Sequence, residues 1–245
     1  MAITAAIGAG GDGTAVGVDP DASSGSRTLV VGDDISVGDR VVTGRSGQVQ
    51  ILFSDQTRLV VGPSSSLLIE QYLMRNDGSA EKLAIKALGG TFRFITGHSA
   101  KSAYQINTPT AAIAIRGTKF DFLVTGDQTL VMLYEGALTA CAPGGKCVAL
   151  NKRCELSQTS RSIARLYLRP DPERIPLSQN FLYARFQTRL LRDFRITGAG
   201  NCVVQQVEVQ PQSLVHSSDF PTQQSRNSGT STPPPTPTPT VRGKN

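Results

Sequence analysis

Residues 107–122 read Asn-Thr-Pro-Thr-Ala-Ala-Ile-Ala-Ile-Arg-Gly-Thr-Lys-Phe-Asp-Phe and show the clearest strand pattern of this chain. Phe120 and Phe122 are two residues apart, so their rings share one face of an extended strand. Pro109 fixes φ and has no N–H donor, which suits the start of a strand. Gly117 permits a conformation or a close approach that a side chain would block. The stretch therefore predicts extended structure with one buried face.

Short runs rich in β-branched residues recur on both sides of this stretch, across residues 27–157. Turn-forming sequences such as Gly-Asp, Asn-Asp-Gly and Thr-Pro separate them. Strands at a spacing of about 8–12 residues with such turns are typical of all-β folds. No helical pattern interrupts the region, which excludes a parallel α/β sheet. We therefore expect an all-β, sandwich- or solenoid-like stack of short strands over 27–157.

The segments that flank this β region differ from it in composition. Residues 1–26 are rich in Gly, Ala, Ser and Asp and predict a flexible N-terminal arm. Residues 158–209 predict a helical extension with a basic face. Residues 210–245 are rich in Pro, Thr, Ser and Gln, so they predict a disordered tail that buries no core.

A helical pattern begins at Ser178, which follows Pro176 and is a good N-cap residue. Apolar residues then repeat every four positions, at Leu182, Phe186, Leu190 and Phe194. Arginines fall on the other side of the helical wheel, at Arg185, Arg189 and Arg192. We predict a basic amphipathic helix that packs its apolar stripe on the β domain. The alternative is weak contact of its arginines with an anionic surface.

The net charge of +6 is local rather than general. Eight arginines and three acidic residues lie between Arg161 and Arg195. One basic patch of this kind does not indicate a nucleic-acid-binding domain. The aromatic content is 6% and Trp is absent, which argues against a carbohydrate-stacking groove or a platform for single-stranded nucleic acid.

The four cysteines lie in the second half of the chain, at positions 141, 147, 154 and 202. An even number is compatible with two disulfides and an oxidising compartment, and it leaves three pairings open. Cys141 and Cys147 flank the turn-forming sequence Ala-Pro-Gly-Gly-Lys and are a candidate disulfide. The spacings lack the short pairs that are typical of zinc sites.

No pattern of catalytic, cofactor-binding or metal-ligating residues stands out. His98 and His216 lie in no metal spacing and beside no nucleophile motif. Residues 8–13 are glycine-rich but lack the βαβ frame of a dinucleotide loop. Acidic residues are scattered over turns and strands, at Asp33, Asp34, Asp39, Asp55 and Glu70. We predict no catalytic residue, no cofactor and no metal.

No run of residues approaches the roughly 20 apolar positions that a membrane-spanning helix needs. The N-terminal sequence Met-Ala-Ile-Thr-Ala-Ala-Ile lacks the basic and apolar regions of a signal peptide. Two expectations follow: a cytoplasmic protein, or a periplasmic or secreted protein whose signal lies upstream of this start.

Several segments, taken in order, resemble the FecR domain family over roughly residues 29–140. Residues 37–57 resemble the opening strands of the family. Residues 89–94 resemble its repeated Gly-x-Phe-Arg-Phe motif, and residues 133–136 resemble a later strand that ends in a glycine. The most specific element is Thr-Pro-x-Ala followed by Arg-Gly-Thr-x-Phe. Its residues here are Thr108, Pro109, Ala111, Arg116, Gly117, Thr118 and Phe120.

The resemblance implies an extracytoplasmic, non-catalytic module that binds another envelope protein in signalling, commonly an outer-membrane receptor. Full regulators of this family also carry a sigma-factor-binding segment and a transmembrane helix, which this sequence does not show. It therefore resembles a stand-alone FecR-domain protein with no nucleic-acid partner. Two alternatives stay open: a structural or surface protein spaced by its Pro/Thr tail, and a hydrolase whose carboxylates meet in the fold.

The signature residues are expected to be structural. Arg116 offers five donors that could tie loop carbonyls or a carboxylate together. The alternative for Arg116 is contact with a ligand.

Overall fold

The computed structural model describes residues 11–100 and 103–203. They form a mixed sheet of 15 strands, followed by short helices. The expected all-β architecture is therefore confirmed, and it belongs to a unit that ends at Gln206. Within the described ranges, no helix is long and apolar enough to cross a membrane.

The strands, in chain order, are β1 (Gly13–Asp19), β2 (Ala22–Ser24), β3 (Arg27–Thr28), β4 (Asp34–Ile35), β5 (Arg40–Thr43), β6 (Gln48–Phe53), β7 (Arg58–Val61), β8 (Ser66–Met74), β9 (Ala80–Ile95), β10 (Tyr104–Asn107), β11 (Ala112–Val124), β12 (Thr129–Cys141), β13 (Cys147–Leu150), β14 (Leu156–Thr159) and β15 (Ala164–Tyr167). The helices are α1 (Arg174–Ser178), α2 (Leu182–Arg185) and the 3-10 helices η1 (Arg192–Phe194) and η2 (Ala199–Cys202).

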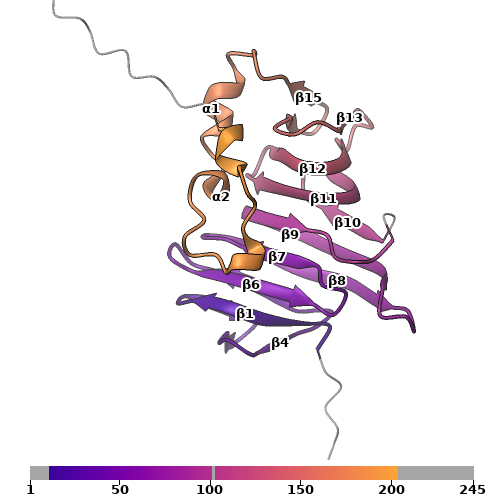
Figure 1. The fold of residues 1–245 in the computed structure, drawn as a ribbon, viewed down its shortest axis with the longest axis vertical. Coiled ribbons are helices and arrows are strands. Elements are labelled where there is room, and N and C mark those ends of the chain that lie inside the picture. The colour runs from indigo at the N-terminus through magenta and orange to yellow at the C-terminus, as the bar shows by residue number, and fades with distance from the viewer. Residues whose placement is uncertain (1–10, 101–102, 204–245) are drawn as a thin grey trace, which may run out of the picture. The chain divides into compact units, whose positions relative to one another are not determined.

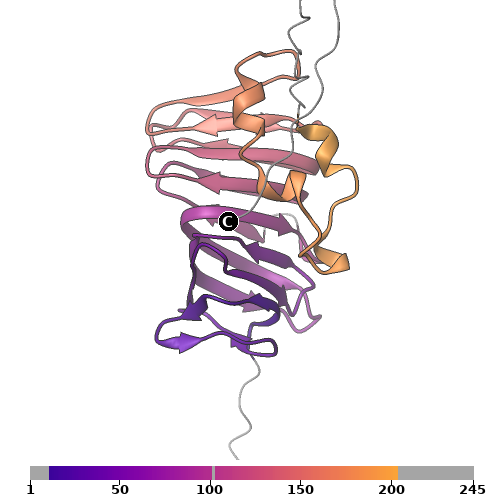
Figure 2. The ribbon, with the colours of Figure 1, turned by 90° about the vertical axis from the view of Figure 1, so that its left-hand side faces the viewer.

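The sheet folds back on itself into two layers, because β9, β11 and β12 change neighbours along their length (Figures 1 and 2). Layer A contains β4, β1, β6, β7, the second halves of β9 and β11, the first half of β12, β14 and β15. Layer B contains β3, β2, β5, β8, the first half of β9, β10, the first half of β11, the second half of β12 and β13. β10 pairs with β9 in parallel.

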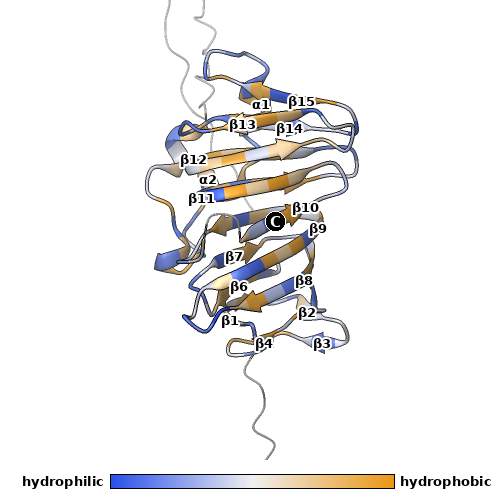
Figure 3. Cartoon of the chain, turned by 90° about the vertical axis from the view of Figure 1, so that its right-hand side faces the viewer, coloured by the Kyte–Doolittle hydropathy of each residue, from blue (hydrophilic) through white to orange (hydrophobic). Residues whose placement is uncertain are grey.

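The main hydrophobic core lies between the two layers. Phe120 and Phe122 are fully buried there, and Phe122 stacks on Phe92 of β9 with ring centroids 4.8 Å apart. Ile85 and Ile113 belong to the same cluster from layer B. Hydrophobic and hydrophilic residues alternate along the strands (Figure 3), because successive side chains point to opposite faces of the sheet. Burial of such faces, at about 25 cal/mol per Å2, supplies the main stabilisation.

Glycines allow β11 and β12 to pass from one layer to the other. Gly117 has φ of +65° and Gly136 has φ of +84°. A Cβ atom on Gly136 would lie 1.8 Å from the carbonyl oxygen of Gly117. The two strands therefore cross between the layers at a point where a side chain on Gly136 has no room.

The predicted boundaries of the β region need two corrections. Residues 13–24, expected in a flexible arm, form β1 and β2; β1 pairs with β6, and Ala15 is fully buried. Small side chains allow this close pairing, since a Cβ on Gly17 would meet the Gln50 side chain at 2.7 Å. The boundary after residue 157 falls inside β14, and β15 continues the sheet. The predicted tail at 210–245 lies outside the described residues.

The helical part predicted after the β region is confirmed, but it consists of short helices and not of one amphipathic helix that starts at Ser178. α1 ends at Ser178, α2 ends at Arg185, and the chain is extended at Phe186, with φ of −131° and ψ of 109°. Arg189 lies between helices, and Arg192 begins η1, so the three arginines share no helical face. The main chain of this segment bonds instead to polar side chains of layer A.

Candidate functional site

The outer face of layer A holds a buried ion pair between β9 and β11. The Arg93 Nε lies 2.7 Å from Oδ1 of Asp121, and its Nη2 lies 2.8 Å from Oδ2. Tyr134 donates its hydroxyl proton to Asp121 Oδ2 at 2.8 Å. Burial alone would lower the pKa of Arg93, but the Asp121 carboxylate outweighs it and the pKa is raised. The pair is therefore buried, and both carboxylate oxygens of Asp121 bond to groups of the same domain.

Residues 174–203, which we name the strap, close this face (Figure 1). Arg93 donates to the carbonyl oxygen of Tyr183 at 2.9 Å and to the side chain of Gln187. Gln50 of β6 contacts the strap main chain twice: Leu191 N donates to its Oε1 at 2.7 Å, and its Nε2 donates to the Arg189 carbonyl at 3.3 Å. Two polar side chains on the outer face of layer A, Arg93 and Gln50, thus bond to the strap.

A disulfide between Cys154 and Cys202 fastens the end of the strap to the loop before β14. The buried Arg174 donates to the carbonyl oxygens of both residues, at 2.8 Å for Cys154 and 2.7 Å for Cys202. The second disulfide joins Cys141 and Cys147 across the β12–β13 hairpin, the candidate pair from the sequence. All four cysteines are therefore bonded.

The acidic residues singled out in the sequence do not assemble into an acid–base pair in the described structure. Asp55 is buried and accepts hydrogen bonds from Thr57 Oγ1 at 2.8 Å, Ser99 Oγ at 2.7 Å and the Tyr104 hydroxyl at 2.8 Å. His98 contributes only its backbone N–H, to the Asp55 carbonyl. Hydroxyl groups thus surround the Asp55 carboxylate and hold the loop after β9 in place.

Other acidic residues singled out in the sequence lie apart from Asp55 and have other hydrogen-bond or ion-pair partners. Asp39 accepts from Ser24 at 2.7 Å, and Glu70 accepts from Asn107 at 3.4 Å. Asp33 pairs with Arg27 at 2.9 Å. No group of three or more His, Cys, Asp or Glu residues among residues 11–100 and 103–203 is arranged to hold a metal ion. His216 lies outside the described residues.

Most signature residues shape the β10–β11 hairpin and the bend of β11. Thr108 bonds to Thr129 at 2.7 Å between hydroxyl oxygens, and Pro109 and Ala111 complete the turn before β11. The backbone N–H of Thr118 donates to Thr96 Oγ1 at 3.0 Å.

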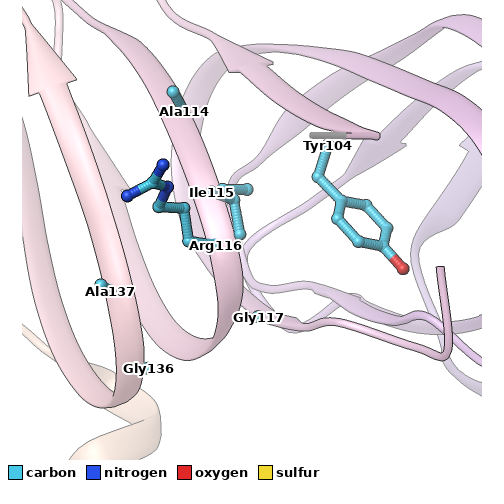
Figure 4. Close-up of a pocket in the computed structure, with 7 residues that line it drawn as sticks. All are labelled: Tyr104, Ala114, Ile115, Arg116, Gly117, Gly136 and Ala137. Atoms are coloured by element: carbon cyan, nitrogen blue, oxygen red, sulfur yellow. The ribbon is translucent and has the colours of Figure 1, made fainter. Parts of the chain in front are cut away.

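Arg116 differs from the other signature residues. Its side chain is exposed and has no hydrogen-bond or ion-pair partner in the part of the chain that the structure describes. The expected ties to loop carbonyls or a carboxylate are therefore not formed. Arg116 and the buried Ile115 leave β11 in opposite directions (Figure 4). The sequence motif identified Arg116 as a signature residue but did not indicate that its side chain is exposed.

The outer face of layer B is not covered by the strap, and we name it the open face. It consists of the outward residues of β9 to β12: Lys82, Ala84, Lys86, Gln105, Asn107, Ala112, Ala114, Arg116, Ala137 and Thr139. A hollow of about 1100 Å3 is lined by Arg116, Ala114 and Ala137 among others (Figure 4). A smaller hollow of about 520 Å3 is lined by Lys86, Asn107 and Ala112 among others. The open face is therefore the candidate functional site.

Comparisons with known proteins bear on the central part of this chain. The structure is similar to two crystal structures, at 1.65 Å and 2.50 Å resolution, of a protein from Parabacteroides distasonis provisionally assigned as an anti-sigma factor. The first has 10% identity and a TM-score of 0.44, and the match covers 57% of this chain and 63% of that one. The second has 10% identity, a TM-score of 0.42, and covers 57% and 62%. This chain thus spans less than two thirds of either structure.

No curated protein matches this chain. The model of the FecR protein family matches residues 39–139, which include all the signature residues and both Arg93 and Asp121. Residues 39–139 of this chain therefore match the FecR family, and the resemblance predicted from its sequence is confirmed.

Proposed function

We propose that this chain is a non-catalytic, extracytoplasmic FecR-domain protein that binds another protein of the cell envelope through the open face. The observation that carries the proposal is the contrast between the two outer faces. Layer A is closed by the strap, whereas layer B presents Arg116 and a row of small residues to solvent. An uncovered face with an unpaired arginine suits docking of a protein, because arginine is enriched at protein–protein interfaces.

The cysteines support an extracytoplasmic location. Both disulfides close within the chain, and one of them, Cys141–Cys147, includes an exposed residue. Disulfides form and persist in oxidising compartments and are rare in the reducing cytosol.

The charges of the fold support a non-catalytic role. Asp121 and Asp55, both buried, have their oxygens occupied by groups of the same domain. The open face carries cations, amides and small side chains but no acid–base pair of the kind that a hydrolase needs.

Photocrosslinking on the open face tests the proposal. We would place p-benzoylphenylalanine at Ala114 of the secreted full-length chain, and at Phe186 of the strap as a matched control, since both side chains are exposed. We expect Ala114 to crosslink one envelope protein and Phe186 to crosslink none. The purified partner should then bind the native chain, and Ala114→Glu should weaken that binding at least about tenfold, equal to about 1.4 kcal/mol.

Two results would refute the proposal. One is equal crosslinking from both positions, or a purified candidate whose affinity Ala114→Glu leaves unchanged. The other is titration of four free thiols in native protein isolated from cells, because that would place the chain in a reducing compartment.

A further inference from the structure

We infer that the open face binds an extended acidic segment of its partner, with one carboxylate at Arg116 and a second at Lys86. The inference rests on the proposed function and adds the chemistry of the partner. Three features carry it: uncompensated positive charge, two separate hollows, and a floor of small side chains between them.

The positive charge comes from Arg40 of β5, Lys82 and Lys86 of β9, and Arg116 of β11. All four are exposed, point outward from layer B by strand alternation, and have no ion-pair partner among the described residues. One acid, Glu70, lines the smaller hollow together with Lys86; it is half-buried, accepts from Asn107 at 3.4 Å, and forms no ion pair with any of these cations. Cations gathered on one face create a field that attracts and orients an anionic partner.

Two exposed cations outside the open face already have carboxylate partners. Lys119 lies 2.7 Å from Glu135 beside the β11 bend, and Arg189 lies 2.8 Å from Asp19. The cations of the open face are therefore available for an external acid without breaking an existing pair.

Each of the two hollows contains one of these cations. Arg116 lines the larger hollow and Lys86 lines the smaller one. Lys86 is opposite Asn107, and Asn107 is opposite Ala112, so Arg116 lies two strands away and four residues further along β11. At about 3.3 Å per residue and 4.8 Å per strand, the two Cα positions are about 16 Å apart.

An extended ligand spans this distance with two carboxylates four residues apart. An even separation places both side chains on the same side of an extended peptide, and four residues cover about 13 Å. The long side chains of Lys86 and Arg116 can close the remaining gap. Ala112 and Ala114 lie between the cations and let a main chain approach closely.

Peptide binding to the full chain tests this arrangement. The probe is a labelled, end-blocked nonapeptide of Ser, Thr and Gly with Asp at positions 3 and 7, and the comparison peptide has Asp at positions 4 and 5. Fluorescence anisotropy should show at least about fivefold tighter binding of the first peptide. Arg116→Glu and Lys86→Glu should each weaken its binding about tenfold, and added salt should weaken it further because the contacts are exposed ion pairs.

Arg192→Glu is the matched control, because Arg192 is an exposed cation on the strap and away from the open face. We expect it to leave peptide binding unchanged. Unchanged thermal unfolding of all three variants shows that the fold is intact, which we expect since none of the three side chains has a partner to lose.

Several outcomes would overturn the inference. Equal affinity for the two peptides, or an equal loss with Arg192→Glu, means that only general charge is sensed. Tighter binding of a single-stranded oligonucleotide of the same charge means that the ligand is a nucleic acid. Absence of peptide binding, with a partner still crosslinked at Ala114, refutes the acidic segment and leaves the proposed function standing.

Discussion

Arg93 and Asp121 face each other across neighbouring strands, with two N–O distances of 2.7 and 2.8 Å and side-chain exposures of 0% and 1%. The pair lies within the FecR-matched range, whereas the strap that covers it lies beyond that range. In this chain, a segment outside residues 39–139 thus covers the Arg93–Asp121 pair and excludes water from it.

Removing one member of this pair should be strongly destabilising. Arg93→Met leaves Asp121 buried without its cation, so we expect a loss of about 3–5 kcal/mol in the free energy of unfolding. Urea unfolding measures the loss. Lys119→Ala is the control, because Lys119 and Glu135 form an exposed pair worth less than about 1 kcal/mol. Similar losses in the two variants would contradict this account.

The bend of β12 should not tolerate a side chain at Gly136. Gly136→Ala places Cβ against the Gly117 carbonyl and also strains a positive φ, which by itself costs about 1–3 kcal/mol. Gly145→Ala isolates the strain, because Gly145 has φ of +81° and nothing within 4 Å of its Cβ position. We expect the larger loss of unfolding free energy in Gly136→Ala. Equal losses would show that the contact between a Cβ at position 136 and the Gly117 carbonyl does not affect stability.

The two disulfides should differ in their contribution to stability. Cys154 and Cys202 are separated by 48 residues, and Cys141 and Cys147 by six. Loop-closure entropy then predicts about 4 kcal/mol for the first and about 2 kcal/mol for the second. Urea unfolding of the two double Cys→Ser variants measures the difference. The opposite ranking would mean that the strap contributes little to the folded state.

Stability should fall at alkaline pH. Burial raises the pKa of Tyr104 and Tyr134, and also that of Tyr72 and Tyr183. Above the ordinary tyrosine pKa of about 10, the unfolded chain loses protons that the folded chain keeps, so unfolding becomes more favourable as the pH rises. The contribution of these tyrosines is fully present below pH of about 10.

Tyrosinate absorbance and urea unfolding between pH of about 8 and 12 check this expectation. The native protein should ionise its tyrosines at higher pH than the denatured chain does. Coincident titration curves would show that these hydroxyls are open to water.

The β region could be predicted from the sequence because its signals are local. Phe120 and Phe122 are two residues apart, and alternation alone places both on one face. Cys141 and Cys147 are joined by a short turn, so their pairing needs no knowledge of the rest of the fold. The small residues of β1 gave too weak a pattern, and its pairing with β6 depends on close packing that composition does not show.

The strap could not be predicted in the same way. Leu182, Phe186 and Leu190 repeat every four residues, yet Phe186 is 56% exposed and the chain around it is extended. Helix formation there competes with hydrogen bonds from Arg93 and Gln50 to the strap main chain. Those partners lie about 90 and 140 residues earlier in the chain, so no local pattern reports them.

Because β9, β11 and β12 each belong to both layers, three continuous strands connect the two layers. Pulling the layers apart would require breaking three strands at their crossing points rather than sliding one sheet over another. A partner that docks on the open face, as proposed, would therefore contact strands that continue directly into layer A.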